Sequence, residues 1–283
     1  MPKPSVNHLE INPNYTAISS WWQHVPIAYW LIEKTKPAVL VELGTHYGVS
    51  FFAFCQAAQL FSPTTRLYAV DTWEGDSQAG YYQEQVYETV SQHAQAHYKD
   101  QAELIRTTFE EATHRFEEAS IDLLHIDGFH SFEAVQTDYN TWKSKMKPTG
   151  IIIFHDIVVH AEGFGVWQFW QNIQRDFPNA TLQDTVWPGL GILFLNGIPE
   201  HLRLDWEQTY PIMASKGLLL AELEQQSRQL QVKSNEIETY QSSLEYTIRH
   251  LEHKKSELDQ IKKRMQRFWL LRFVYRLVKL FDK

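Results

Sequence analysis

The stretch Val39-Leu40-Val41-Glu42-Leu43-Gly44-Thr45-His46-Tyr47-Gly48 decides the fold of this sequence. It is an apolar run that ends in an acid and two glycines, and Val49 to Phe54 continue it at helical spacing. This order predicts a buried strand that turns tightly into a helix. Such a turn leaves backbone N–H groups available for an anion or carboxylate, and Gly44 lets a ligand approach the backbone closely. A turn with a purely structural role is the alternative.

The same pattern recurs along the chain. Further apolar runs are 66–71, 103–109, 121–127 and 150–156, and helical segments lie between them at 110–118, 131–146 and 163–177. This alternation predicts a parallel sheet with helices on both faces, which binds ligands outside the carboxyl ends of its strands. The polar residues at those ends are Glu42, Asp71, Asp127, His155 and Asp156. Two last runs, 181–187 and 191–196, are joined by Pro188-Gly189 and predict an antiparallel hairpin.

The composition excludes several classes of protein. The 283 residues are 43% hydrophobic, which suffices for a packed core, and the formal net charge of −8 argues against nucleic acid as the main partner. The single cysteine, Cys55, permits neither a disulfide framework nor a thiolate metal site, and we expect it in the buried core. We see no secretory leader and no membrane-spanning apolar run, so we expect a cytoplasmic protein.

Beyond residue 200 the apolar residues follow a different period. An apolar side chain recurs every seven residues, at Leu223, Leu230, Ile237, Leu244, Leu251, Leu258 and Met265. This is the seam of a coiled coil and predicts a homo-oligomer. The companion stripe three residues earlier is mostly polar, so a single helix packed on its own domain is the alternative.

The last segment, 261–283, is basic in an otherwise acidic chain. It carries eight Lys or Arg residues and one Asp, a local charge of 8 − 1 = +7, interleaved with aromatic residues such as Trp269 and Phe273. A basic amphipathic helix of this kind predicts binding to the inner face of a membrane. Packing against a partner protein is the alternative. Nucleic acid is disfavoured, because the apolar content exceeds what phosphate binding needs.

Four motifs taken together resemble a known family of enzymes. They are 41–48, Val70 to Asp76, His125 to Glu133 and Phe154 to Asp156. In this order they are similar to class I S-adenosylmethionine-dependent methyltransferases, and more narrowly to the group associated with glycan biosynthesis and the macrocin-type sugar O-methyltransferases. The resemblance covers residues 37–197. It implies a Rossmann-like α/β fold, with a seven-stranded, mostly parallel sheet and a terminal antiparallel hairpin, followed here by the long C-terminal coiled-coil helix.

The expected organisation has five parts. These are an N-terminal arm and helix (1–36), the methyltransferase domain (37–200), a linker (201–217), the coiled coil (218–260) and the basic amphipathic helix (261–283). Within the domain, a polar insertion at 74–100 is long enough to cover the site.

The resemblance implies a set of cofactor-binding residues. They are Glu42, Gly44, Thr45, His46, Gly48, Asp71, Thr72, Trp73, Thr108, Phe109 and Asp127. Glu42 and the turn after it would hold the methionine end of S-adenosylmethionine, and Asp71 would accept hydrogen bonds from the ribose hydroxyls. Thr108 or Phe109, at the end of the third strand, would border the adenine. Trp73 would stack on the cofactor or the acceptor, or else pack under the insertion.

The resemblance also implies a catalytic cluster. Asp127 and Asp156 would hold a divalent cation, magnesium or manganese, together with His155, which stands where relatives carry a second acid. His130 would be the general base that takes the proton of the acceptor hydroxyl, with Asp127 beside it, because imidazole has a pKa near neutral pH. A histidine that caps the helix beginning at Ser131 is the alternative for His130.

We therefore expect an S-adenosylmethionine-dependent O-methyltransferase that acts on a hydroxyl of a sugar or glycan precursor. Two other classes stay open. One is a non-enzymatic, membrane-associated scaffold built on this fold. The other is a metal-dependent, hydroxylase-like enzyme that holds iron with Asp127, His130 and His155. No motif identifies the acceptor, because its pocket would come from 74–100 and 157–166.

Overall fold

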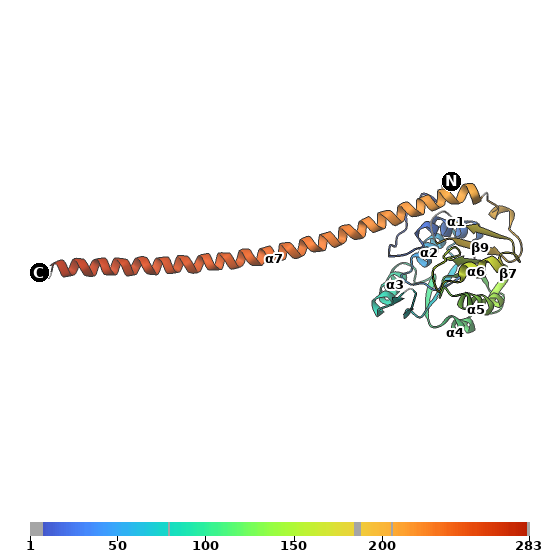
Figure 1. Ribbon diagram of the computed structural model, residues 1–283, viewed down its shortest axis with the longest axis horizontal. Coiled ribbons are helices and arrows are strands. Elements are labelled where there is room, and N and C mark those ends of the chain that lie inside the picture. Colours follow the sequence, from blue (N-terminus) through green and yellow to red (C-terminus); the bar gives the residue numbers. More distant parts are fainter. Residues whose placement is uncertain (1–7, 79, 184–187, 205, 282–283) are drawn as a thin grey trace. The chain divides into compact units, whose positions relative to one another are not determined.

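A computed structural model describes residues 8–281 except 79, 184–187 and 205. The chain forms two units, residues 1–224 and residues 225–283, and each is described by itself (Figure 1). The first unit contains the sheet and its helices. The second consists of most of one helix.

The first unit is built on a seven-stranded sheet with the strand order β5-β2-β1-β6-β7-β9-β8. The strands are β1 (Val39–Leu43), β2 (Arg66–Asp71), β5 (Ala102–Arg106), β6 (Ile121–Ile126), β7 (Met146–His155), β8 (Asn179–Leu182) and β9 (Leu190–Phe194). The first five are parallel, whereas β9 is antiparallel to both β7 and β8. The expected fold class is therefore confirmed. A small hairpin, β3 (Gly75–Asp76) and β4 (Gly80–Tyr81), stands apart from this sheet.

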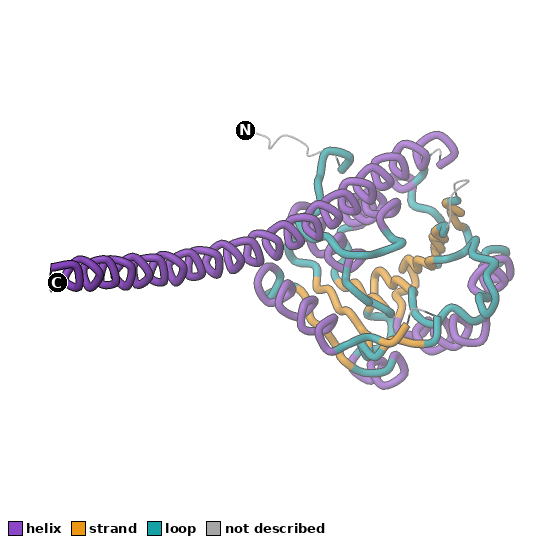
Figure 2. The backbone as a smooth tube through the Cα atoms, turned by 60° about the vertical axis from the view of Figure 1, so that its left-hand side comes forward, coloured by secondary structure: helices purple, strands orange, loops and turns teal. Residues whose placement is uncertain are grey.

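Helices cover both faces of the sheet, as Figure 2 shows. Side chains alternate along each strand, so that Leu40 joins one buried cluster and Val41 the other. The first cluster includes side chains of α1 (Val25–Thr35), α2 (Val49–Phe61) and α3 (Glu84–His97). The second includes those of α4 (Phe109–Ala112), α5 (Phe132–Trp142) and α6 (Val166–Ile173). Cys55 lies fully buried in the first cluster, as expected.

Short 3₁₀ turns join or extend several of these elements. They are Trp22–His24, Thr113–Arg115, Lys143–Lys145 and Glu200–Leu202. The first leads into α1, and the second and third follow α4 and α5 directly.

Several strand boundaries differ from the sequence expectation, among them the start of β7, which lies at Met146 and not at residue 150. The third strand was expected to reach Phe109 but ends at Arg106, because the Thr108 hydroxyl caps α4 by accepting a hydrogen bond from Glu111 N–H at 3.3 Å. The expected hairpin is present as β8 paired with β9, although the predicted strand 181–187 falls partly on residues 184–187, which lie outside the described residues.

The N-terminal segment and the presumed linker both belong to the first unit. Trp21 and Tyr210 are buried in the same cluster as α1 and α2. The last helix, α7 (Trp206–Phe281), begins within the segment 201–217, and a Cβ on Gly217 would lie 2.3 Å from the Cα of Gln23. Close backbone packing against residues 22–23 thus holds the start of α7, within the segment expected to be a linker.

The second unit consists of the α7 residues from Gln225 onward. The side chains of the heptad seam are exposed, from 53% at Leu223 to 68% at Leu230. In the described part of the chain, no helix is both long enough and apolar enough to cross a membrane.

Candidate active site

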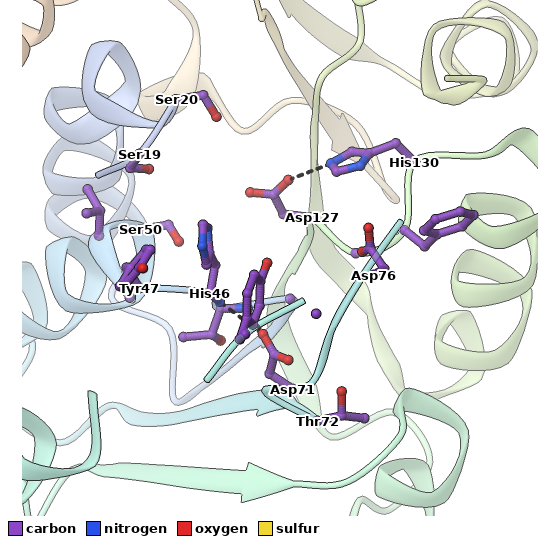
Figure 3. Close-up of a pocket in the computed structure, with 18 of the residues that line it drawn as sticks. Ser19, Ser20, His46, Tyr47, Ser50, Asp71, Thr72, Asp76, Asp127 and His130 are labelled. Atoms are coloured by element: carbon purple, nitrogen blue, oxygen red, sulfur yellow. Dashed lines mark hydrogen bonds and ion pairs between the residues drawn. The ribbon is translucent and has the colours of Figure 1, made fainter. Parts of the chain in front are cut away.

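A cavity of about 480 Å³ opens at the carboxyl ends of β1, β2 and β6 (Figure 3). The chain runs from β1 outward to β2 and β5 and then returns to β6 on the other side of β1, so the cavity lies at the topological switch point. Its wall includes Ser19, Ser20, the turn 44–50, Asp71, Thr72, Asp76, Tyr82, Thr108, Phe109, Asp127, His130, Asp156 and Phe164.

The turn after β1 is held by backbone packing. Gly44 has φ +86°, and a Cβ there would lie 2.0 Å from the carbonyl oxygen of Asp127. Asp127 N–H in turn donates to the carbonyl of Leu43 at 2.8 Å. The sequence indicated that glycine is needed here so that a ligand can approach the backbone. The structure adds a second reason, because the end of β6 leaves no room for a Cβ.

Asp71 organises the floor of the cavity. Its carboxylate accepts three backbone hydrogen bonds, from Thr45 N–H at 2.8 Å, His46 N–H at 2.9 Å and Trp73 N–H at 2.7 Å. A carboxylate offers about four acceptor positions, so one remains for a ligand. Asp71 lines the cavity and also anchors the turn, and its role as acceptor for the ribose hydroxyls stays a prediction. The N–H groups of Thr45 and His46 are already paired with protein.

Glu42 does not line the cavity, contrary to its predicted contact with the cofactor. It is fully buried, and its Oε2 lies 2.8 Å from Nδ1 of His125, whose Nε2 accepts a hydrogen bond from Trp21 Nε1 at 3.2 Å. Burial raises the pKa of Glu42, and hydrogen bonds with His125 and Ser50 oppose that rise. Oε1 is buried without a partner that meets hydrogen-bond geometry in the described structure.

Trp73 packs under the insertion, which was the alternative to stacking on the cofactor. Its side chain is 1% exposed, its Nε1 donates to the carbonyl of His46 at 3.1 Å, and its ring lies 5.1 Å from that of Tyr87 on α3. Its neighbour Thr72 does line the cavity, as do Thr108 and Phe109.

Asp127, His130 and Asp156 meet on the opposite wall. Nε2 of His130 lies 2.8 Å from Oδ2 of Asp156 and 3.8 Å from Oδ1 of Asp127. Figure 3 shows Asp127 and His130 pointing toward each other. Asp156 follows the end of β7 with φ +60°, a conformation rare for residues other than glycine, and aspartate tolerates it better than most.

His130 is held as an imidazolium. Its Nδ1 lies 3.1 Å from Oε1 of Gln78, so both ring nitrogens face oxygen acceptors and only the doubly protonated ring can donate to each. Burial lowers the pKa of His130, but its contacts with Asp127 and Asp156 outweigh burial and raise the pKa to about 9. The predicted general base is therefore already protonated at neutral pH. Ser131, not His130, caps α5, by accepting from Ala134 N–H at 3.2 Å.

His155 lies behind the two carboxylates and does not line the cavity. Its Nδ1 is 3.1 Å from Oδ1 of Asp127 and 3.4 Å from Oδ1 of Asp156. Burial lowers the pKa of His155, yet the two carboxylates raise it to about 10. Conversely, burial raises the pKa of Asp156, and the two histidines bring it down to about 2. Two carboxylates and two imidazoliums thus form a cluster without net charge.

Three ligand atoms of the cluster could hold a divalent cation. One atom each from Asp127, His130 and Asp156 lies within 4.8 Å of the others. His155 was the predicted third ligand, but its Nδ1 faces the carboxylates from the side away from the cavity. The iron site considered as an alternative, with Asp127 and both histidines, is not assembled among the described residues. The donor set fits a cation on one condition, that His130 gives up its Nε2 proton.

Several residues in or beside the cavity were not singled out from the sequence. Gln78 of the insertion accepts hydrogen bonds from His130 and donates from Nε2 to the carbonyl of Gly163 at 3.0 Å. Asp76 and Tyr82 come from the same insertion, whose length was the only signal. Ser19 and Ser20 come from the N-terminal segment, where the polar sequence gave no reason to expect a site.

Comparisons with known proteins find similarity in sequence and in fold. Residues 41–157 match the sequence model of a family described as a methyltransferase domain. The chain is 39% identical over 211 residues to the protein y4gI of Sinorhizobium fredii; the match covers 70% of this chain and 23% of that protein. The chain thus spans less than a quarter of the length of this relative.

Solved structures with a similar arrangement include two O-methyltransferases. One is TomG from Streptomyces achromogenes, involved in tomaymycin synthesis and in complex with SAM, at 14% identity and a TM-score of 0.49, over 64% of this chain and 82% of that one. The other is from Bacillus cereus, in complex with SAH, at 13% identity and a TM-score of 0.48, over 64% of this chain and 83% of that one.

Proposed function

We propose that the protein is an S-adenosylmethionine-dependent O-methyltransferase. One observation carries the proposal: the cavity at the switch point joins the Asp71-anchored turn to the Asp127/His130/Asp156 cluster. The proposed cofactor site and the proposed proton acceptor thus lie in the same cavity. The match of residues 41–157 to a methyltransferase domain supports the same assignment.

The cavity has features that suit this cofactor. Its volume of about 480 Å³ lies within the usual range for sites that bind small molecules. The aromatic rings of His46 and Tyr82 stack with centroids 4.5 Å apart beside the turn. The buried Oε1 of Glu42 has an unused acceptor position, which an ammonium group or a water molecule behind the wall at Ser50 could fill. Asp71, the turn 44–48, Thr72, Thr108 and Phe109 would hold the cofactor.

When bound, S-adenosylmethionine supplies an electrophilic methyl group on a sulfonium centre. The protein positions the acceptor hydroxyl, excludes water and receives the proton. The hydroxyl becomes strongly acidic as its oxygen gains the methyl group, so the carboxylate of Asp127 is basic enough to take the proton. His130 and His155 hold Asp127 in its ionised form, because their positive charges keep its pKa well below the usual value against the effect of burial. We therefore assign proton acceptance to Asp127 and positioning to His130.

A hydroxyl of a sugar or glycan precursor is the acceptor that we propose. The part of the cavity lined by Ser19, Ser20 and Asp76 offers hydroxyl and carboxylate groups, and Tyr82 offers an aromatic ring. Hydrogen-bonding groups beside an aromatic ring suit the polar edges and apolar faces of a pyranose. The resemblance to methyltransferases of glycan biosynthesis supports the same class.

The test is methyl transfer from labelled S-adenosylmethionine to a panel of monosaccharides and oligosaccharides, with amines and carboxylates of similar size alongside. We expect a methyl ether on a sugar hydroxyl, and a large loss of transfer for Asp127→Asn. Glu133→Gln, on the same segment but outside the cavity lining, is the matched control and should retain activity. Transfer to nitrogen or carboxylate acceptors, with none to hydroxyls, would contradict the proposal.

A divalent cation would be held by Asp127, Asp156 and, once deprotonated, His130. Oxygen ligands suit magnesium, and one imidazole shifts the preference toward manganese. Such a cation would bind and orient neighbouring hydroxyls of the acceptor. Titration of the protein with manganese, followed by electron paramagnetic resonance, should show a site that Asp156→Asn weakens. An unchanged free-manganese signal at millimolar protein would exclude a cation in the cluster.

We also propose that α7 serves for self-association and that its end serves for membrane contact at the cytoplasmic face. Support for contact comes from the charge of +7 in 261–283 and from exposed aromatic side chains such as Trp269, at 69%, and Phe268, at 68%. The test is flotation with vesicles containing anionic lipid, with and without residues 261–283. Equal flotation of the two chains would refute membrane contact through this segment.

A further inference from the structure

We propose that two copies of this chain pair through α7 in a parallel, in-register coiled coil. The inference rests on the proposed self-association and adds its partner, orientation and register. It does not depend on methyltransferase activity. The evidence lies in the charges that flank the exposed heptad seam.

The seam residues fit the d positions of the heptad. Numbering them as d places Ser227, Ser234, Gln241, Ile248 and Lys255 at the a positions. The other choice would make Gln226, Lys233, Tyr240, Thr247, Lys254 and Ile261 the companion core positions. Each choice thus puts two lysines into the core, Lys255 and Lys262 in the first or Lys233 and Lys254 in the other. Most of the seam residues are leucines, and leucine at d with a β-branched residue such as Ile248 at a favours a parallel two-stranded coiled coil, so we take the first choice.

In that register one flank of the helix is acidic. From Leu230 onward the e positions, directly after each seam residue, are Gln231, Glu238, Glu245, Glu252 and Asp259, whereas the earlier e residue, Glu224, is buried. The opposite flank carries no acid. Its g positions, three residues after the seam, are Gln226, Lys233, Tyr240, Thr247, Lys254 and Ile261.

These two flanks select the parallel arrangement. In a parallel coiled coil, a g residue faces the e residue five positions further along the partner helix. Lys233 then meets the partner's Glu238, and Lys254 meets the partner's Asp259, each twice by symmetry. No g–e pair between 226 and 266 brings like charges together. In an antiparallel pair, e positions face e positions, so the acidic flank would oppose itself along its whole length.

The polar a positions fix the register at some cost in stability. A polar residue at a single a position is known to specify register and oligomeric state, and here Ser227, Ser234 and Gln241 follow one another. A shift of one heptad would place Ile248 opposite a polar side chain on the partner. The parallel pair also brings the two basic segments 261–283 to the same end, which would double the positive charge available to one membrane surface.

Engineered cysteines test the orientation directly in the full chain. The native Cys55 is fully buried, so an introduced cysteine is the accessible thiol of each variant. Ser234→Cys occupies an a position, where two copies face each other in the parallel, in-register pair. Thr239→Cys occupies an outward f position and is the matched control. Under mild oxidation we expect a covalent dimer from Ser234→Cys and almost none from Thr239→Cys.

A charge exchange tests the pairing independently. Lys233→Glu replaces two attractive contacts per dimer with two repulsive ones and should weaken the dimer on the order of tenfold, as measured by sedimentation. Adding Glu238→Lys should restore the wild-type affinity.

The possible outcomes separate the two levels of the proposal. A chain that sediments as a monomer at all concentrations would overturn self-association itself. A dimer in which Ser234→Cys does not cross-link, or in which Glu238→Lys fails to rescue Lys233→Glu, would overturn the parallel register while leaving self-association intact. Methyl transfer by either form would bear on the enzymatic proposal alone.

Discussion

Replacing Gly44 with alanine should destabilise the first unit through a clash that can be read from the backbone. The new Cβ would lie 2.0 Å from the carbonyl oxygen of Asp127 and 2.6 Å from its carbonyl carbon, at φ +86°. The left-handed conformation costs about 1–2 kcal/mol for alanine. Separating β1 from the end of β6 would also strain the 2.8 Å hydrogen bond from Asp127 N–H to the Leu43 carbonyl. We expect a total loss of about 3–5 kcal/mol in the free energy of unfolding.

Gly80→Ala is the matched control for this substitution. Gly80 has φ +87°, but a Cβ there meets nothing within 4 Å. It should therefore show only the conformational cost, about 1–2 kcal/mol. Urea unfolding followed by tryptophan fluorescence measures both variants against wild type. Equal losses for Gly44→Ala and Gly80→Ala would refute the argument that the Asp127 carbonyl makes Gly44 indispensable.

Three further substitutions test separate parts of the first unit, the first of them at Asp138 on α5. Burial raises the pKa of Asp138 to about 7, so the folded state holds a proton that the unfolded state loses near pH 4, and this group lowers stability as pH rises from about 4 to 7. Asp138→Asn should therefore add about 4 kcal/mol to the free energy of unfolding at pH 8 and almost nothing at pH 4; a gain independent of pH would contradict this. Asp156→Asn leaves two imidazoliums with one carboxylate, so we expect methyl transfer to fall on the order of a hundredfold with the affinity for S-adenosylhomocysteine retained; full activity would exclude a role for the cluster. Trp73→Phe removes the hydrogen bond to the His46 carbonyl and should cost about 1 kcal/mol of stability with a less than roughly tenfold loss of S-adenosylhomocysteine affinity by calorimetry, whereas a larger loss of affinity would favour stacking on the cofactor.

The parallel sheet could be predicted because its signals are local. Each of the first strands is a short apolar run with a polar side chain at or near its end, such as Asp71 or Asp127. Parallel strands bring these ends to one edge regardless of how each side chain turns. The end of β5 was misjudged because Thr108 is equally suited to a strand and to a helix cap, and the cap prevailed.

The functions of individual side chains were harder to predict, because they depend on contacts distant in sequence. Glu42 turns toward His125, 83 residues away, and so leaves the cavity. The carboxylates of Asp127 and Asp156 raise the pKa of His130, and Gln78, which lies in an insertion without a recognisable motif, faces its other ring nitrogen. A sequence pattern indicates which residues reach the edge of the sheet, but the protonation of each depends on which partners surround it there.

The sequence likewise did not predict that the first turns of α7 pack against the rest of the first unit. The segment 201–217 reads as a linker because its composition changes after residue 200. In the structure, Tyr210 and Met213 are buried, and Gly217 permits close contact with the backbone at Trp22 and Gln23. Only tertiary contact distinguishes such a segment from a free linker.

Calorimetric titration with S-adenosylhomocysteine tests the central claim most directly. The account predicts micromolar binding to the wild-type chain. Asp71→Ala should abolish it, because the turn at Thr45 and His46 loses its anchor, and Glu88→Ala, at an exposed position of α3, should leave it unchanged. No binding to a folded wild-type chain would contradict the account and favour a scaffold built on this fold.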